Sequence, residues 1–125
     1  MGLFNTKKKI LIVDDSESIR NTFSQYVPGE MEVYTAEDGA QGLNKLMTHK
    51  PDLIFSDLGM PNMDGFKFIA AIRKMEKFSK IPIVVISASE IFFDVNKALD
   101  LGANDYIEKN SINSDKLRAK INKFI

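Results

Sequence analysis

Five side chains in this sequence belong to types that bind metal ions or transfer phosphoryl groups, and each stands at or just after an apolar run. They are Asp14, Asp15, Asp57, Ser87 and Lys109. The clearest case is Asp57, which closes the apolar run 53–55 and precedes a loop rich in Gly, Pro and Asn. Because burial penalises a charged carboxylate, an aspartate in that position needs a specific stabilising partner.

The three aspartates would repel one another if the fold brought them together, so a positive charge must lie among them. Lys109 and a divalent cation are the two candidates. The ligands would all be oxygens, from carboxylates, water and a backbone carbonyl of the loop after Asp57. Hard oxygen ligands without histidine or cysteine favour Mg²⁺, with Mn²⁺ as a substitute.

A carboxylate held beside a cation and an ammonium group can act as a nucleophile. Asp57 could attack phosphorus and form an acyl phosphate, while the cation and Lys109 neutralise the charge on the transferred group. The hydroxyl of Ser87 could then donate a hydrogen bond to an oxygen of the attached phosphoryl group. The predicted chemistry is metal-assisted phosphoryl transfer to Asp57.

Taken singly, each of these residues also has a purely structural explanation. The acidic pair could only cap a helix and complement its dipole, and Asp57 could simply open a turn. Ser87 could be an ordinary hydroxyl at a strand end, and Lys109 a surface lysine. The combination carries the argument, because the residues follow different predicted strands and all lie at one edge of the sheet.

The elements that position these residues follow from the hydrophobic pattern. Apolar runs without alternation predict strands covered on both faces, as in parallel sheets. The expected strands lie at 10–13, 31–35, 53–55, 81–86 and 105–107. Helical spacing fills the stretches between them. This alternation predicts one α/β domain with a parallel sheet and helices on both faces, whose functional crevice lies beyond the carboxyl ends of the strands.

Capping residues predict where the helices begin and end. Ser16 and Asp64 are expected to cap the first and third helices. Glu37 or Asp38 is expected to open the second helix, and Ser114 or Asp115 the last. Gly102 is expected to end the fourth helix in the left-handed conformation. Met31, Met47 and Met75 are expected to fill gaps in the core.

Composition excludes several classes of protein. The 125 residues carry a formal net charge of +0, which argues against a nucleic-acid or anionic-membrane partner. The absence of cysteine excludes disulfides, thiolate catalysis and cysteine-based zinc sites. No apolar stretch approaches the ~20 residues that cross a bilayer. We expect a single soluble cytoplasmic domain over residues 1–125, with residues 1–8 as a short flexible N-terminal extension.

Four stretches resemble the receiver domain of two-component response regulators. They are ILIVDDSESIR, PDLIFSDLGMPNMDG, IPIVVISAS and ALDLGANDYIEK. The resemblance spans nearly the whole chain, from about Lys9 to Ile125. It implies a doubly wound (βα)₅ flavodoxin-like fold with strand order 2-1-3-4-5.

The resemblance also assigns roles to the candidate residues. It implies that Asp57 is the phosphorylated aspartate, that Asp15 binds Mg²⁺ directly and that Asp14 does so mainly through water. The backbone carbonyl of Gly59 would be a further ligand. Three other assignments are Ser87 as the switch hydroxyl beside the small Ala88, Lys109 as the partner of the phosphate, and Tyr106 as the switch aromatic.

Two features depart from the pattern of this family. The family usually has proline after the lysine, often with a cis bond, whereas Asn110 follows Lys109 here. A non-proline peptide bond is trans by default, which could re-aim Lys109 or shift the start of the last helix. Ile91, Phe92 and Phe93 form an apolar cluster just past Ser87, and we expect at least one of them to belong to an exposed partner surface.

The resemblance implies a signalling switch rather than an enzyme. A histidine kinase, phosphotransfer protein or small phosphodonor would phosphorylate Asp57, and the face of the last two helices and the fifth strand would change its affinity for a protein target. A stand-alone, monomeric regulator of the chemotaxis type is expected, although an excised receiver fits equally well.

Two other functions stay open. One is a degenerate receiver that only scaffolds, which the missing proline keeps in consideration. The other is an aspartate-nucleophile phosphatase, which needs a second aspartate as general acid two residues after the nucleophile. Gly59 occupies that position and argues against the phosphatase.

Overall fold

The computed structural model describes residues 7–88 and 92–125, and at residues 92–93 the backbone alone. The expected N-terminal extension, residues 1–8, therefore lies mostly outside the described residues. Strands and helices alternate along the described chain as the sequence predicts. The elements are β1 (Lys9–Val13), α1 (Glu17–Tyr26), β2 (Glu32–Ala36), α2 (Gly39–His49), β3 (Leu53–Asp57), α3 (Gly65–Lys74), the 3₁₀ helix η1 (Glu76–Phe78), β4 (Ile83–Ser87), α4 (Phe92–Leu101), β5 (Asp105–Glu108) and α5 (Ser114–Phe124).

The five strands form one parallel sheet in the order β2-β1-β3-β4-β5, which confirms the predicted fold. The order reverses between β1 and β3, because the chain first adds β2 on one side of β1 and then β3 on the other. Where the connections that leave two adjacent strands run in opposite directions, a crevice forms beyond the carboxyl ends of those strands. Asp14 follows β1 and Asp57 ends β3, so both residues lie at that crevice.

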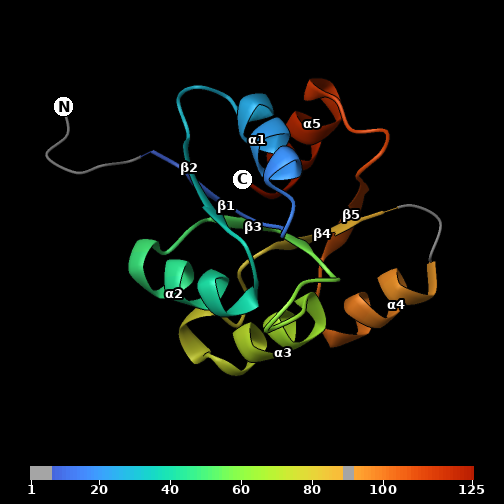
Figure 1. Ribbon diagram of the computed structural model, residues 1–125. Helices are drawn as coiled ribbons and strands as arrows, with labels where there is room; N and C mark the ends of the chain where they lie inside the picture. Colours follow the sequence, from blue (N-terminus) through green and yellow to red (C-terminus); the bar gives the residue numbers. More distant parts are fainter. Residues whose placement is uncertain (1–6, 89–91) are drawn as a thin grey trace, which may run out of the picture.

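Helices cover both faces of the sheet, with α1 and α5 on one face and α2, α3 and α4 on the other (Figure 1). Each face has its own apolar cluster. Phe23, Phe55 and Ile121 belong to the cluster under α1 and α5, and Phe68 and Leu46 to the cluster under α2 and α3. Every residue of β3 and β4 is buried, which explains why both strands begin with apolar runs that show no alternation.

The capping predictions are confirmed at the first three helices that have a described cap. The side chains of Ser16, Asp38 and Asp64 each accept a hydrogen bond from the first turn of the helix that follows. The last helix, α5, begins at Ser114 as predicted, and Asn113 caps it by accepting from the Lys116 amide at 2.8 Å. Gly102 adopts the expected positive φ, at 121°.

The core prediction for Met47 was wrong. Its side chain is 53 % exposed, whereas its neighbour Leu46 is fully buried against the sheet. Successive helical positions are rotated by about 100°, so one of two adjacent apolar residues faces away from the sheet. Met31 and Met75 are partly buried against the core as expected. In the part of the chain that the structure describes, no helix is long and apolar enough to span a bilayer.

Gly65 marks the closest approach between the start of α3 and the end of β3. A methyl group at this position would collide with the backbone carbonyl of Asp57 and lie 2.7 Å from the Leu58 Cα. We expect Gly65→Ala to lower the free energy of unfolding by about 2 kcal/mol or more, since backbone atoms cannot yield cheaply. Urea denaturation measures the change.

Gly59 in the same loop provides the matched control. A methyl group there meets nothing within 4 Å, and the φ of Gly59 is outside the left-handed region. Gly59→Ala should therefore change stability by no more than about 0.5 kcal/mol. Equal stability of the two variants would show that α3 does not need this close contact.

Candidate functional site

The carboxyl edge of the sheet gathers the side chains that the sequence singles out. Asp14 directly follows β1, Asp57 and Ser87 are the last residues of β3 and β4, and Lys109 directly follows β5. Asp14, Asp57 and Ser87 are all buried. The Lys109 amide donates to the Ser87 carbonyl at 2.8 Å, so the ladder between β4 and β5 continues to the lysine. Strand pairing therefore fixes the backbone position from which each of these side chains extends.

The ammonium of Lys109 lies between two buried carboxylates. Its Nζ is 3.1 Å from Asp14 Oδ2 and 3.2 Å from Asp57 Oδ2. Asp14 Oδ1 accepts from the Ser16 amide at 2.8 Å, and Asp57 Oδ1 from the Leu58 amide at 2.8 Å. Each carboxylate thus has one oxygen held by backbone and one directed at the lysine.

Lys109 reaches the aspartates without the proline that usually follows it. The described residues contain no cis peptide bond, so Lys109 and Asn110 are joined in the trans form. The concern that a trans bond re-aims the lysine is not borne out, because its Nζ contacts both carboxylates. The backbone between β5 and α5 accommodates asparagine while keeping the ammonium in the crevice.

The charges in this crevice do not balance. Burial raises the pKa of Asp57, the nearby Asp14 raises it further, and the lysine offsets only part of this increase. Burial lowers the pKa of Lys109, but the attraction of Asp57 and Asp14 outweighs it, so the net shift is upward. One ammonium for two buried carboxylates leaves a negative pocket that a further cation would stabilise.

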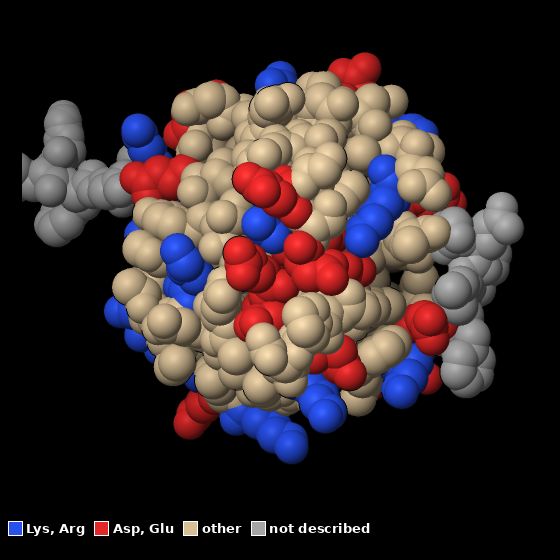
Figure 2. Space-filling model, in the orientation of Figure 1, with Lys and Arg blue, Asp and Glu red and all other residues tan. Residues whose placement is uncertain are grey.

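The acidic groups fit a divalent cation. One carboxylate oxygen each from Asp14, Asp15 and Asp57 lies within 4.8 Å of the others, so the three are close enough together to be ligands of one ion. Asp14 Oδ2 is buried and accepts no hydrogen bond in the structure, although Lys109 is close to it. Figure 2 shows acidic side chains gathered near the centre of the face presented, with a basic side chain between them.

A small hollow adjoins Asp57 on the side of β4. It has a volume of about 110 Å³ and is lined by Asp57, Leu58, Gly59, Ile86, Ser87, Ala88 and Asp94. Since a water molecule occupies about 30 Å³, the hollow has room for a group of several heavy atoms. Asp57, Gly59, Ser87 and Ala88 are therefore brought together at one opening, as the sequence predicts.

Two residues near the site were not singled out from the sequence. Asp94 of α4 lines the hollow. Arg20 of α1 donates from Nη1 to the Asp14 carbonyl at 2.7 Å and lies 3.8 Å from a carboxylate oxygen of Glu37. Arg20 lies one helical turn past the cap Ser16, a spacing that would have placed it at the sheet edge. Nothing in the sequence signals Asp94, because its position depends on where α4 packs.

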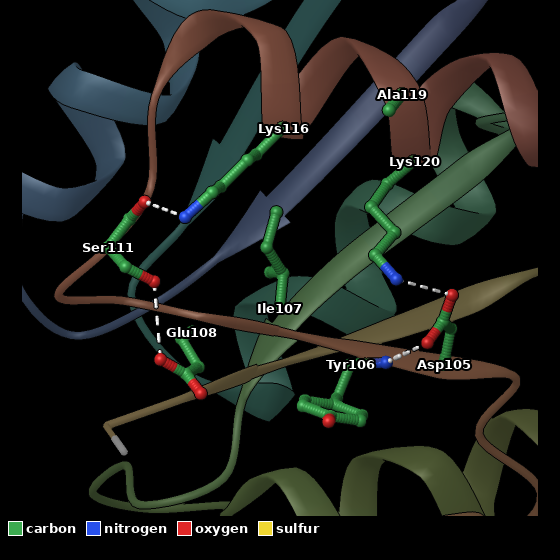
Figure 3. A pocket seen from close by; sticks show the side chains of 8 residues that line it. All are labelled: Asp105, Tyr106, Ile107, Glu108, Ser111, Lys116, Ala119 and Lys120. Carbon is green, nitrogen blue, oxygen red and sulfur yellow. Dashed lines mark hydrogen bonds and ion pairs between the residues drawn. The ribbon is translucent and has the colours of Figure 1, made fainter.

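The predicted switch residue Tyr106 lies away from the crevice. Tyr106 is 36 % exposed on β5 and lines a pocket of about 620 Å³ between β5 and α5. Figure 3 shows Lys120 reaching from α5 to Asp105 of β5 and Lys116 reaching to Ser111 in the loop before α5. Ile107 and Tyr106 point to opposite sides of the strand. The predicted partner surface falls outside the described part of the chain, because Ile91 is not described and α4 is described at Phe92 and Phe93 only in its backbone.

Comparison with solved structures identifies close relatives of this fold. The chemotaxis protein CheY4 of Vibrio cholerae superposes with a TM-score of 0.88 at 30 % sequence identity, covering 96 % of this chain and 100 % of that one. The phosphorylated cyanobacterial phytochrome response regulator RcpA superposes with a TM-score of 0.80 at 29 % identity, covering 94 % of this chain and 91 % of that one.

Sequence comparisons give the same result. The KDP operon transcriptional regulatory protein KdpE of Escherichia coli is 42 % identical over 80 % of this chain and 44 % of its own length. Protein PilG of Pseudomonas aeruginosa is 32 % identical over 81 % of this chain and 76 % of its own. The chain spans about half the length of the first curated relatives it matches.

A family comparison covers nearly all of the domain. The model of the response regulator receiver domain matches residues 10–122, which include Asp14, Asp57, Ser87 and Lys109. Receivers of this family are phosphorylated on an aspartate, and they interact with histidine kinases and downstream targets. With the crevice, the fold and the matches in agreement, the chain belongs to the response regulator receiver family and is a phosphorylation-activated switch of two-component signalling.

Proposed function

We propose that Asp57 is the phosphoacceptor and that Lys109 and Ser87 assist the transfer. The observation that carries this proposal is the single ammonium held 3.2 Å from Asp57 Oδ2 beside the 110 Å³ hollow. A carboxylate oxygen of Asp57 attacks phosphorus and forms the new O–P bond. The P–N bond to the donor histidine breaks, and the departing imidazole nitrogen takes up a proton.

The proposal gives the acidic groups the task of holding Mg²⁺ or Mn²⁺. Asp14, Asp15, Asp57 and the carbonyl of Gly59 would be its ligands, and the bound ion supplies positive charge to the oxygens of the transferred group. Lys109 would neutralise part of the same charge. The buried position of Asp57 keeps these interactions strong, because little water screens them.

The output of the switch is proposed to involve β5 and α5. After phosphorylation the hydroxyl of Ser87 donates to a phosphoryl oxygen, and Tyr106 leaves its half-exposed position. The 620 Å³ pocket between β5 and α5 lies beside Tyr106, so a change in the ring alters the surface offered to a protein target. A monomeric receiver that serves one kinase or phosphotransfer protein and one protein target fits this arrangement.

Phosphorylation of Asp57 can be tested with a small phosphodonor. Acetyl phosphate and Mg²⁺ should add the mass of one phosphoryl group to the wild-type chain, measured by intact mass spectrometry. The addition should disappear with excess EDTA and in Asp57→Ala, because the nucleophile and the ion are both required. Asp100→Ala, which removes an exposed aspartate of α4, should be modified like the wild type.

The same samples separate the rival functions. An unmodified wild-type chain in the presence of Mg²⁺ would favour the scaffolding receiver. Sustained multiple turnovers of p-nitrophenyl phosphate would favour the phosphatase.

Removing the charge of Asp57 should stabilise the metal-free protein. Because burial and Asp14 raise the pKa of Asp57 above its value in the unfolded chain, the ionised carboxylate destabilises the fold at neutral pH. Asp57→Asn should therefore raise the free energy of unfolding by an amount on the order of 1 kcal/mol without Mg²⁺. The advantage should shrink as the pH falls through the raised pKa, because the wild-type carboxyl then becomes neutral in the folded state.

Mg²⁺ should reverse the ranking of these two proteins. An ion that binds only the folded state stabilises the wild type, and Asp57→Asn removes one of its ligands. Asp100→Asn, which neutralises an exposed aspartate of α4, should match the wild type with and without the ion. A wild type that Mg²⁺ leaves unchanged would contradict the proposed cation site.

The link between Ser87 and Tyr106 can be followed by NMR of labelled tyrosine rings. Beryllofluoride with Mg²⁺ should shift the Tyr106 resonance in the wild type, and Ser87→Ala should reduce the shift because the hydroxyl no longer contacts the bound group. Tyr34 of the distant strand β2 serves as the internal control. An unmoved Tyr106 in a wild type that binds beryllofluoride would rule out this route to the output face.

A further inference from the structure

The loop between β3 and α3 holds Gly59 and is fixed firmly at its base. Leu58 is buried, its amide donates to Asp57 Oδ1, and its carbonyl accepts from the Gly65 amide at 2.8 Å. Beyond Leu58 the loop turns outward, and Gly59, Pro61 and Asn62 are exposed. Glycine has the freest backbone of any residue, so the base alone does not fix where the Gly59 carbonyl points.

The tip of this loop is fastened to the first turn of α2. Asn62 Nδ2 donates to Asp38 Oδ2 at 2.8 Å, across 24 residues of sequence. The Gly39 amide donates to the Met63 carbonyl at 2.9 Å. A methyl group on Gly39 would lie 2.7 Å from Met63 Cγ, so the two segments touch.

Asp38 serves two elements at once. Its side chain caps α2 by accepting from the Gln41 amide at 2.8 Å through Oδ1, and its other oxygen holds Asn62. The residue is only 5 % exposed, so a lost partner is not readily replaced by water. The two hydrogen bonds, from Gln41 first and Asn62 second, lower the pKa of Asp38 and keep it charged. Hydrogen bonds to a carboxylate are the stronger kind.

Asn62 adopts a backbone conformation that needs outside support. Its φ is 64°, and the Met63 amide donates to the Pro61 carbonyl at 2.7 Å across it, as in a tight three-residue turn. Such conformations are strained for residues other than glycine and persist where the surroundings hold them. The hydrogen bond to Asp38 and the contact between Gly39 and Met63 supply that support.

The segment from Met60 to Asn62 is stiff, so fastening Asn62 also restricts the position of Gly59. Pro61 fixes its own φ and restricts Met60 to extended conformations, and Met60 packs against the core under α2 and α3. Gly59 thus lies between a buried residue and a stiff, fastened segment. We propose that Asp38 and Asn62 are positioning residues that set the Gly59 carbonyl for the divalent cation, an inference that rests on the proposed role of that carbonyl.

The test measures cation binding to the unphosphorylated protein. Mg²⁺ affinity is determined by calorimetry, and Mn²⁺ affinity by the electron paramagnetic resonance signal of the free ion. Asn62→Asp places a second carboxylate against Asp38, and Asn62→Gly keeps the positive φ while removing the amide. Both should raise the dissociation constant roughly three- to tenfold, at or below the low end of effects from outer-shell residues.

The direction of the Asn62→Asp effect separates geometry from charge. An added negative charge near a cation site should tighten binding if only electrostatics mattered, so weaker binding indicates a displaced ligand. Asn44→Asp on α2 adds the same charge away from the loop and serves as the control. It should leave the dissociation constant unchanged or slightly lower.

A reciprocal exchange provides the rescue. In the double variant Asp38→Asn with Asn62→Asp, the amide now donates from the start of α2 and the carboxylate accepts on the loop. The asparagine introduced before α2 can still cap that helix through its side-chain oxygen. Cation affinity should return toward the wild-type value. In acetyl phosphate reactions, the single variants should need more Mg²⁺ for half the maximal rate while approaching the wild-type rate at saturation.

The outcomes distinguish this inference from the function on which it rests. A wild type that fails to bind Mg²⁺ would overturn the cation site itself. A wild type that binds Mg²⁺, with both Asn62 variants binding it equally well, would overturn the positioning role alone. A double variant no better than Asn62→Asp would also count against the positioning role, because the restored hydrogen bond is what the inference requires.

Discussion

The ion pair of Lys109 with Asp14 and Asp57 is the interaction on which the rest of the site depends. Two carboxylates at the ends of buried strands would be costly without it, since the desolvation of a charge exceeds what a distant partner can offset. The positive charge of the lysine offsets part of this cost, but negative charge remains in excess, as the raised pKa of Asp57 indicates. The fold therefore holds a pocket whose remaining negative charge favours a cation, and through a cation the oxygens of a phosphoryl group.

The parallel sheet is what allows this pair to form. Asp14 and Asp57 come from strands that are adjacent in the sheet although far apart in sequence, and Lys109 arrives from β5, two strands away from β3. A long, flexible lysine side chain can bridge that distance from the sheet edge, whereas a shorter cation-bearing group could not. The alternation of strand and helix thus acts as a rigid frame, and the chemistry lies on the short segments that leave it.

Much of this architecture could be predicted because each polar residue interrupts an apolar run. Asp57 stands out against Leu53–Phe55, and its neighbours in space follow from the parallel strands. Details that depend on packing could not be read in this way. Asn113, Ser114 and Asp115 are all good caps, so only the backbone conformation decides which of them caps α5. Leu46 and Met47 are adjacent on α2, and the rotation between successive helical positions places only Leu46 against the sheet. The hydrogen bond between Asp38 and Asn62 joins residues with no shared pattern, so the sequence carries no signal for it.

The two sides of Asp57 are built for different tasks. Toward α2, buried contacts and charged hydrogen bonds hold the loop around Gly59, a rigidity that suits a ligand whose position must not vary. Toward β5, the path from Ser87 ends at Tyr106, an aromatic side chain that is already partly exposed and therefore loses little burial if it moves. In the proposed switch, a covalent phosphate then acts on the side where motion is cheap, while the side that holds the cation keeps its shape in both states.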